Sequence, residues 1–206
     1  MNLPNRITIA RILMIFLFLI ICNVDEYLPE AYRWSWRLTG LIFAILAGLT
    51  DILDGYIARK YNLVTDFGRL VDPLADKIFM ATTFIMLVAK NILPGWVAVV
   101  VLSREFLVTG LRLLATNKGK VISADVTGKL KTSLQMAFLI IGGSFWVQGF
   151  TRRELSPTTR GIWEVAIWIV IFVTVYSGLT YFIQYRHLYL TDSELTKQSG
   201  KNITGE

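Results

Sequence analysis

The chain has 206 residues, of which 54% are hydrophobic and only 17% are charged, and its formal net charge is +6. With a mean hydropathy of +0.53, this composition excludes an ordinary soluble domain and indicates an integral membrane protein. We therefore expect membrane lipids, and no nucleic acid, as partners. Cys22 is the only cysteine, which excludes an intrachain disulfide.

Apolar runs of about the 20 residues needed to cross a bilayer recur along the chain. The six runs cover residues 7–22, 38–58, 74–90, 94–115, 132–150 and 161–185. No dense basic segment precedes the first run and no small-residue cleavage site follows it, so we expect it to remain as a helix. The predicted fold class is an all-α integral membrane protein with six transmembrane helices. Residues 1–190 form the membrane domain, and residues 191–206 form a polar, disordered tail.

The placement of lysine and arginine predicts the orientation, because cytoplasmic loops carry the excess of these residues. With six spans and the N-terminus inside, thirteen of them fall on the inner side and six on the outer side. The bias predicts that both termini are cytoplasmic. The connection between the second and third helices then lies on the cytoplasmic side.

Aspartates stand at helical spacing among apolar residues on both sides of that connection. Asp51 and Asp54 are three residues apart, and Asp72 and Asp76 are four apart, so each pair lies on one face of a helix. An ionised carboxylate that is buried costs several kcal/mol unless it is compensated. Neighbouring arginines and lysines are one possible compensation. Four carboxylates at this spacing favour divalent cations, which take oxygen ligands from several carboxylates at once.

Small residues accompany the aspartates. Gly55 and Gly68 flank the carboxylates, where a missing side chain lets a ligand approach the backbone; the alternative is helix packing. We assign Gly40, Ala44 and Gly48, which share one helical face upstream, to packing alone.

Pro73 leaves the start of the third helix open. Proline suits the first turn of a helix and disturbs its interior. A start at Asp72 would leave Gly68 on the loop, whereas a start near Asp66 would place Gly68 and both later aspartates on one helix. We expect the start near Asp66, with a local kink at Pro73.

The fixed positions of this region form one pattern. They are Asp51, Asp54, Gly55, Ala58, Arg59, Gly68, Asp72 and Asp76. The pattern resembles the signature of the CDP-alcohol phosphotransferase family, with every fixed position at the family's spacing. The resemblance implies a six-helix membrane enzyme, acting as a homodimer, in which an alcohol displaces CMP from a CDP-linked substrate.

The resemblance also implies roles for the matching positions. Two Mg²⁺ or Mn²⁺ ions are held by Asp51, Asp54, Asp72 and Asp76. Asp76 is in addition the base that accepts the alcohol proton. The CDP group is lined by Gly55, Ala58, Arg59 and Gly68.

Further motifs lie between residues 2 and 135. NLPNRITIAR, SREFLVTGLRLLA, GKVISA and GKLKTSLQ look like those of the bacterial phosphatidylglycerophosphate synthases within that family. This likeness implies CDP-diacylglycerol as donor, glycerol 3-phosphate as acceptor, and a multi-pass location in the bacterial cytoplasmic membrane. The polar active-site cavity is then expected toward the cytoplasm.

An anionic acceptor needs cations of its own. Arg104 lies inside an apolar run, where an arginine is costly unless it faces a partner or an aqueous cavity, and Arg112 follows two turns later on roughly the same face. Lys129 and Lys131 open the fifth helix. We propose these four as the acceptor phosphate site; the alternative is that the lysines extend to lipid headgroups. Arg11, in the first run, could face the same site or anchor the helix at the interface.

Two other functions remain open. A cardiolipin synthase of the same family would use phosphatidylglycerol, a lipid that lacks a terminal phosphomonoester and has less use for the added cations. A divalent-cation or proton-coupled transporter would also carry intramembrane carboxylates. Transporter sites lie near the middle of the membrane between repeated halves, whereas these aspartates gather toward one face and no second half repeats them.

Overall fold

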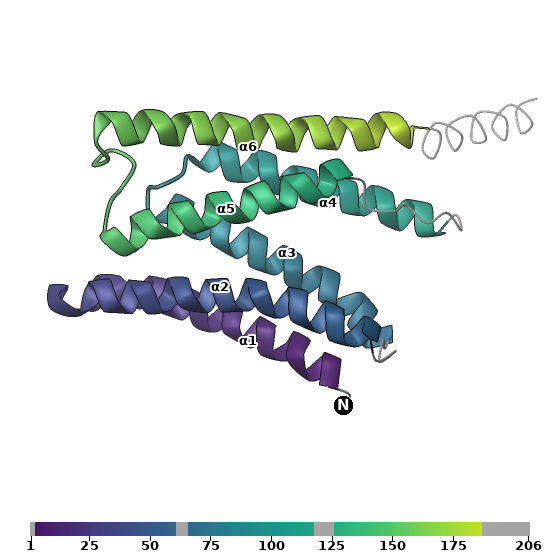
Figure 1. Ribbon diagram of the computed structural model, residues 1–206, viewed down its shortest axis with the longest axis horizontal. Coiled ribbons are helices and arrows are strands. Elements are labelled where there is room, and N and C mark those ends of the chain that lie inside the picture. Colours follow the sequence, from purple (N-terminus) through teal and green to yellow (C-terminus); the bar gives the residue numbers. More distant parts are fainter. Residues whose placement is uncertain (1–2, 61–65, 118–125, 187–206) are drawn as a thin grey trace, which may run out of the picture. The chain divides into compact units, whose positions relative to one another are not determined.

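The computed structural model describes residues 3–60, 66–117 and 126–186. Within these ranges the chain is helical and contains no strand (Figure 1). The elements are α1 (Leu3–Val24), the 3-10 helix η1 (Asp25–Tyr27), α2 (Glu30–Lys60), α3 (Asp66–Ala89), α4 (Gly95–Asn117), α5 (Val126–Gln148) and α6 (Pro157–Gln184). Each predicted apolar run coincides with one α-helix, which confirms the all-α class. The predicted tail, residues 191–206, lies outside the described ranges.

The helices differ from the apolar runs at their ends. α5 stops two residues before the predicted end at 150, because Gly149 adopts a φ of +79°. The Gly149 N–H donates to the Trp146 carbonyl at 2.9 Å, and the Phe150 N–H donates to the Phe145 carbonyl at 3.0 Å. These two bonds form the Schellman motif that closes many helices.

The starts of α2 and α3 can be compared with those expected from the sequence. α2 begins at Glu30, eight residues before the apolar run, because glutamate, alanine and arginine favour helix without being apolar. α3 begins at Asp66 and continues through Pro73, as expected from the sequence. Gly68 is therefore in the first turn of α3 and not on a loop.

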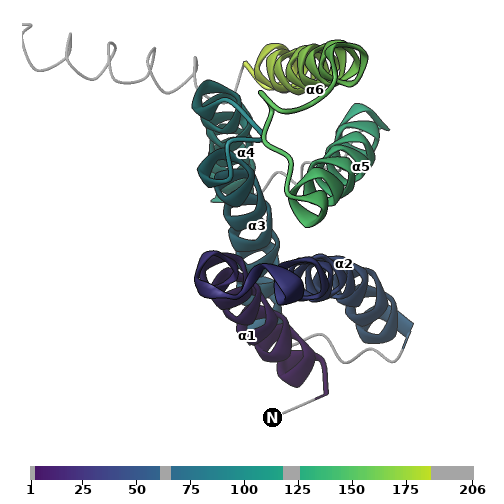
Figure 2. The same cartoon turned by 90° about the vertical axis from the view of Figure 1, so that its left-hand side faces the viewer.

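The helices belong to two compact units, each described here by itself. Unit 1 comprises Met1–Ala98 and Met136–Ala166, and unit 2 comprises Val99–Gln135 and Ile167–Glu206. In unit 1, α1 packs against both α2 and α3. Figure 2 shows these three helices from a second direction.

The small residues of α2 are a packing surface, as predicted. A Cβ atom on Gly40 would lie 2.8 Å from the Trp146 ring and 2.9 Å from Ile21, and one on Gly48 would lie 2.9 Å from the Met136 methyl group. Ala44 between them is buried. A side chain at Gly40 would therefore press on the Trp146 ring and Ile21, whereas one at Gly48 would displace the flexible end of Met136.

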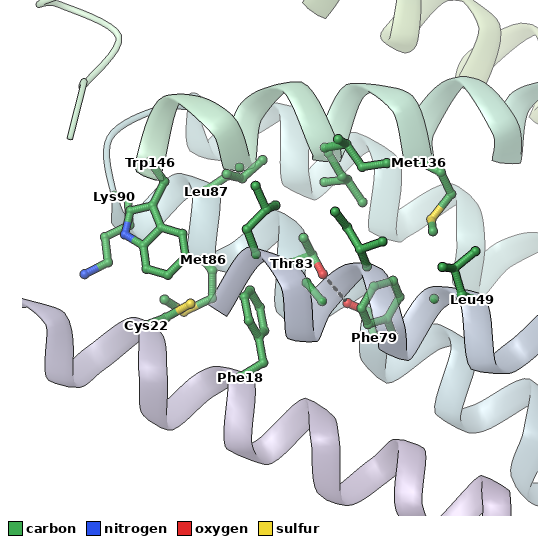
Figure 3. Close-up of a pocket in the computed structure, with 17 residues that line it drawn as sticks. Phe18, Cys22, Leu49, Phe79, Thr83, Met86, Leu87, Lys90, Met136 and Trp146 are labelled. Atoms are coloured by element: carbon green, nitrogen blue, oxygen red, sulfur yellow. Dashed lines mark hydrogen bonds between the residues drawn. The ribbon is translucent and has the colours of Figure 1, made fainter. Parts of the chain in front are cut away.

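An apolar cavity of about 110 Å³ lies within unit 1, lined by side chains of α1, α2, α3 and α5 together with Lys90. Figure 3 shows Phe18, Met86 and Phe79 along it, with Trp146 and Lys90 at one end. The hydroxyl of Thr83 is already used, because it donates to the Phe79 carbonyl at 2.8 Å. An apolar lining of this kind does not favour bound water.

One buried carboxylate ties four segments of unit 1 together. Asp25 is fully buried and accepts hydrogen bonds from Arg37 Nε at 2.7 Å, Lys90 Nζ at 2.6 Å and Trp146 Nε1 at 3.2 Å. These donors come from α2, from the end of α3 and from α5. Asp25 therefore fixes one end of the helix bundle of unit 1.

Large apolar side chains are also exposed, most clearly along α6. They are Ile162, Val165, Trp168, Ile169, Phe172, Val175, Tyr176, Leu179 and Ile183. In the part of the chain that the structure describes, two helices are long and apolar enough to cross a membrane, Leu130–Gln148 of α5 and α6. A helix that is apolar on its exposed side as well suits a lipid environment. The six-span topology with both termini inside stays a prediction.

The buried carboxylate gives the first test. We expect Asp25→Asn to lower the free energy of unfolding in detergent by about 3–5 kcal/mol, because it leaves buried cations without their counter-charge. Glu26→Gln is the matched control: its carboxylate also pairs with Lys90, but its side chain is 68% exposed, so its loss costs at most about 1 kcal/mol. Equal losses for the two variants would show that Asp25 does not anchor the bundle.

Candidate functional site

The four signature aspartates lie at one end of unit 1. Asp51 and Asp54 are in the helical part of α2, and Asp72 and Asp76 are in α3. α2 ends at Lys60, α3 begins at Asp66, and the two helices contact each other (Figure 1). Both pairs therefore lie near the α2–α3 connection, which we call the acidic end.

The side chains of the acidic end are described only in part. Asp76 is exposed, whereas the side chains of Asp51, Asp54 and Asp72 lie outside the described residues. Among the described side chains, no group of three or more His, Cys, Asp and Glu lies together. The helical backbone nevertheless gives each pair the same-face spacing, and carboxylate oxygens are the ligands that Mg²⁺ and Mn²⁺ prefer. The donor set thus fits a divalent ion by its chemistry.

The candidate CDP-binding residues share this end. Gly55, Ala58 and Arg59 lie in the last turns of α2, and Gly68 lies in the first turn of α3. The described side chains do not include those of these residues. Their roles stay predictions.

Arg104, on α4, points into unit 2. Its Nη2 donates to Ser177 Oγ at 2.7 Å and its Nη1 to Glu105 Oε1 at 3.1 Å. Gly178 leaves room for it, because a Cβ atom there would lie 3.1 Å from Arg104 Cγ. Ser177 therefore holds the guanidinium against α6, while Glu105 pairs with it from α4 itself.

Arg112 also contacts α6, about one helical turn after the residue that Arg104 contacts. Its Nη2 donates to the hydroxyl of Tyr181 at 2.7 Å, and its guanidinium carbon lies 5.3 Å from the centre of the Tyr181 ring. The guanidinium carbon of Arg104 lies 5.8 Å from the same centre. Tyr181 is buried, and both guanidinium groups are within cation–π distance of its ring.

Lys131, on α5, belongs to the same group. Its side chain is 3% exposed, and its Nζ forms an ion pair with Glu105 Oε1. This burial argues against the alternative that Lys131 extends to a lipid headgroup. The side chain of Lys129 lies outside the described residues. We call Arg104, Glu105, Arg112, Lys131 and Tyr181 the basic cluster.

The basic cluster combines three cations with one carboxylate. In addition, the Nε atoms of Arg104 and Arg112 are buried without a hydrogen-bond partner in the described part of the protein. A buried donor without a partner is costly. Both the excess charge and these donors suit a bound anion.

Unit 2 contains further buried polar residues that were not predicted from the sequence. Gln135 Nε2 donates to Thr174 Oγ1 at 3.0 Å, and both side chains are buried. Thr174, Ser177 and Tyr181 recur at intervals of three and four residues inside an apolar run. That polar face on an otherwise apolar helix was the available signal.

Arg11, which the sequence left open, is buried within α1. A side chain that is 1% exposed is not an anchor in the membrane interface. The burial of Arg11 thus argues against the role of an interfacial anchor.

Comparison with known proteins shows the family. The chain matches the model of the family described as CDP-alcohol phosphatidyltransferase over residues 1–176. The chain belongs to the CDP-alcohol phosphatidyltransferase family. The match includes all four aspartates of the acidic end, and enzymes of this family use divalent metal ions. Family membership and the apolar helices together identify a membrane protein.

Individual proteins are similar to this chain over most of its length. A protein of Bacillus subtilis is 41% identical over 195 residues, which are 88% of this chain and 93% of its own. A protein of Rickettsia typhi is 37% identical over 184 residues, which are 88% of this chain and 95% of the length of that protein. One from Salmonella typhimurium is 35% identical over 155 residues, 71% of this chain and 81% of its own. All three are named CDP-diacylglycerol–glycerol-3-phosphate 3-phosphatidyltransferase.

Proposed function

We propose that this phosphatidyltransferase moves the phosphatidyl group of CDP-diacylglycerol to glycerol 3-phosphate, giving phosphatidylglycerophosphate and CMP. The observation that carries the proposal is the shared name of relatives that are 35–41% identical over most of the chain. In the reaction, a hydroxyl oxygen of the acceptor forms a bond to the phosphatidyl phosphorus. The bond from that phosphorus to CMP breaks, and CMP leaves with the electron pair.

The acidic end is the proposed centre of this reaction. Asp51, Asp54, Asp72 and Asp76 would hold two Mg²⁺ or Mn²⁺ ions, which would supply positive charge to the phosphate groups during transfer. Asp76 accepts the proton of the acceptor hydroxyl. Its exposed position on α3 supports this role, because a water-soluble acceptor must reach the base.

The residues around the aspartates are proposed to hold the CDP group. Gly55 and Gly68 leave the backbone accessible, and Ala58 keeps the same helical face open. Arg59 donates to phosphate oxygens through its several N–H groups. Their places in the last turns of α2 and the first turn of α3 support this assignment.

The basic cluster is the proposed site of the acceptor phosphate. Arg104 and Arg112 offer buried Nε donors, Lys131 adds charge, and Lys129 begins the same helix as Lys131. A phosphomonoester carries up to two negative charges and takes donors from several sides. This supports glycerol 3-phosphate as acceptor over phosphatidylglycerol, the acceptor of a cardiolipin synthase.

The proposed setting is a bacterial cytoplasmic membrane. Six helices cross it with both termini in the cytoplasm, residues 1–190 form the membrane domain, and the active-site cavity opens toward the cytoplasm. The excess of inner lysine and arginine supports the orientation, and it puts the acidic end within reach of soluble glycerol 3-phosphate. A homodimer is proposed by family likeness alone. A transporter finds no support in the names of the relatives.

Release of CMP from purified protein tests the function. We expect CMP from CDP-diacylglycerol when glycerol 3-phosphate and Mg²⁺ or Mn²⁺ are present, little when phosphatidylglycerol replaces glycerol 3-phosphate, and background levels when a chelator is added. Asp51→Asn serves as the inactive control. Faster release with phosphatidylglycerol would make the protein a cardiolipin synthase, and full turnover in chelator would remove the metal assignment.

Substitutions in the proposed CDP site and in the proposed acceptor site are expected to affect the KM of different substrates. Lysine keeps the charge of arginine but loses its planar fork. Arg104→Lys should therefore raise the KM for glycerol 3-phosphate more than the KM for CDP-diacylglycerol, and Arg59→Lys should do the reverse. A lost charge-assisted hydrogen bond is worth about 1.5–3 kcal/mol, or on the order of ten- to a hundred-fold in kcat/KM.

The matched control for both substitutions is Arg33→Lys. Arg33 donates to the carbonyl of Leu28 at the other end of unit 1 and should leave both KM values unchanged. Equal effects of Arg104→Lys and Arg59→Lys on both substrates would contradict the assignment of Arg104 to the acceptor.

A further inference from the structure

A polar cleft of about 690 Å³ lies at the end of unit 1 that is remote from the acidic end. It is bounded by the end of α3, the start of α4, the connection between α5 and α6, and the first turns of α6. Its charged lining consists of Arg152, Arg153, Arg160 and Glu164. Positive charge is therefore in excess. The proposed reaction uses none of these residues.

One of the three arginines is already paired. Arg152 contacts Glu164 Oε1 through Nε at 2.6 Å and Nη2 at 2.5 Å. Its backbone N–H donates to the Asn91 carbonyl at 3.0 Å, which ties the α5–α6 connection to the end of α3. The charges of Arg152 and Glu164 offset each other. The excess positive charge of the cleft therefore comes from Arg153 and Arg160.

Arg153 and Arg160 are held close together without a carboxylate. Arg160 Nη2 donates to the Arg153 carbonyl at 2.5 Å, and within the described residues neither guanidinium forms an ion pair. The nearby carboxylate of Glu154 accepts the Thr151 N–H at 2.8 Å, and its hydrogen bonds with Thr151 hold its pKa below the usual value. It is therefore charged but engaged elsewhere. Both arginines line the cleft, and a guanidinium group matches the geometry of a phosphate.

Exposed aromatic side chains surround this end. Trp96 follows Gly95 of the cleft, Phe150 precedes Thr151 of the cleft, and both are more than two fifths exposed. Tyr32 and Trp34, at the start of α2, are also exposed. Tryptophan and tyrosine gather where membrane meets water. These exposed aromatic side chains are those expected near lipid headgroups.

We propose that this cleft binds a phosphate group through Arg153 and Arg160. The phosphate is carried either by the headgroup of an anionic phospholipid or by free inorganic phosphate. The site is distinct from the proposed active site, and its occupation does not depend on the proposed function.

Two binding measurements on the full-length protein in detergent test the proposal. Native mass spectrometry compares adducts with phosphatidylglycerol and with phosphatidylcholine, and thermal unfolding is followed while inorganic phosphate is added. We expect the double variant Arg153→Gln/Arg160→Gln to bind the phosphate ligand about tenfold or more weakly than the wild type does. Arg33→Gln, at the same end but outside the cleft, should bind as the wild type does. CMP release should be unchanged in both.

The outcomes separate the two sources of phosphate. A preference for phosphatidylglycerol that the double variant loses, without a response to inorganic phosphate, identifies a lipid headgroup site. A stabilisation by inorganic phosphate that the double variant loses identifies a free-phosphate site. Equal binding by wild type and double variant in both measurements overturns the proposal. If the glutamine variant fails to fold, Arg153→Ala and Arg160→Ala are measured singly, and unchanged binding in both has the same meaning.

Discussion

A charged group inside an apolar helix bundle must find a partner, and this constraint organises the protein. Asp25 meets it within unit 1 by accepting from Arg37, Lys90 and Trp146. In unit 2, Glu105 joins Arg104 to Lys131. These pairings join η1 to α2, α5 and the residue after α3 in unit 1, and α4 to α5 in unit 2. The charges that hold the bundles together are therefore internal to the protein.

The same constraint connects the fold to the proposed chemistry. Four carboxylates at one end of two contacting helices repel one another unless cations stand between them, and a pyrophosphate requires those same cations. The basic cluster presents the complementary case, in which cations and buried Nε donors outnumber the acid. Transfer between two anionic substrates needs both kinds of site, and the proposed reaction would use both.

Much of this could be predicted from the sequence. Apolar runs of bilayer length located the six α-helices of the described residues, and the pattern containing Asp51, Asp54, Asp72 and Asp76 indicated the family. The helix ends were less predictable, because Glu30 extends α2 by propensity and Gly149 ends α5 by its backbone conformation. The partners of Asp25 and Arg112 could not be predicted. Trp146 is 121 residues from Asp25 and Tyr181 is 69 from Arg112, so only the packed structure brings them together.

The central claim is that the acidic end holds divalent cations, and direct binding tests it without any turnover. Purified protein is titrated with Mn²⁺ while the electron paramagnetic resonance signal of the free ion is recorded. The account predicts two ions bound per wild-type chain, loss of that binding in Asp51→Asn/Asp72→Asn, and unchanged binding in the control Glu26→Gln. Mn²⁺ binding by the double variant that equals the wild type, or no binding by the wild type, would contradict it.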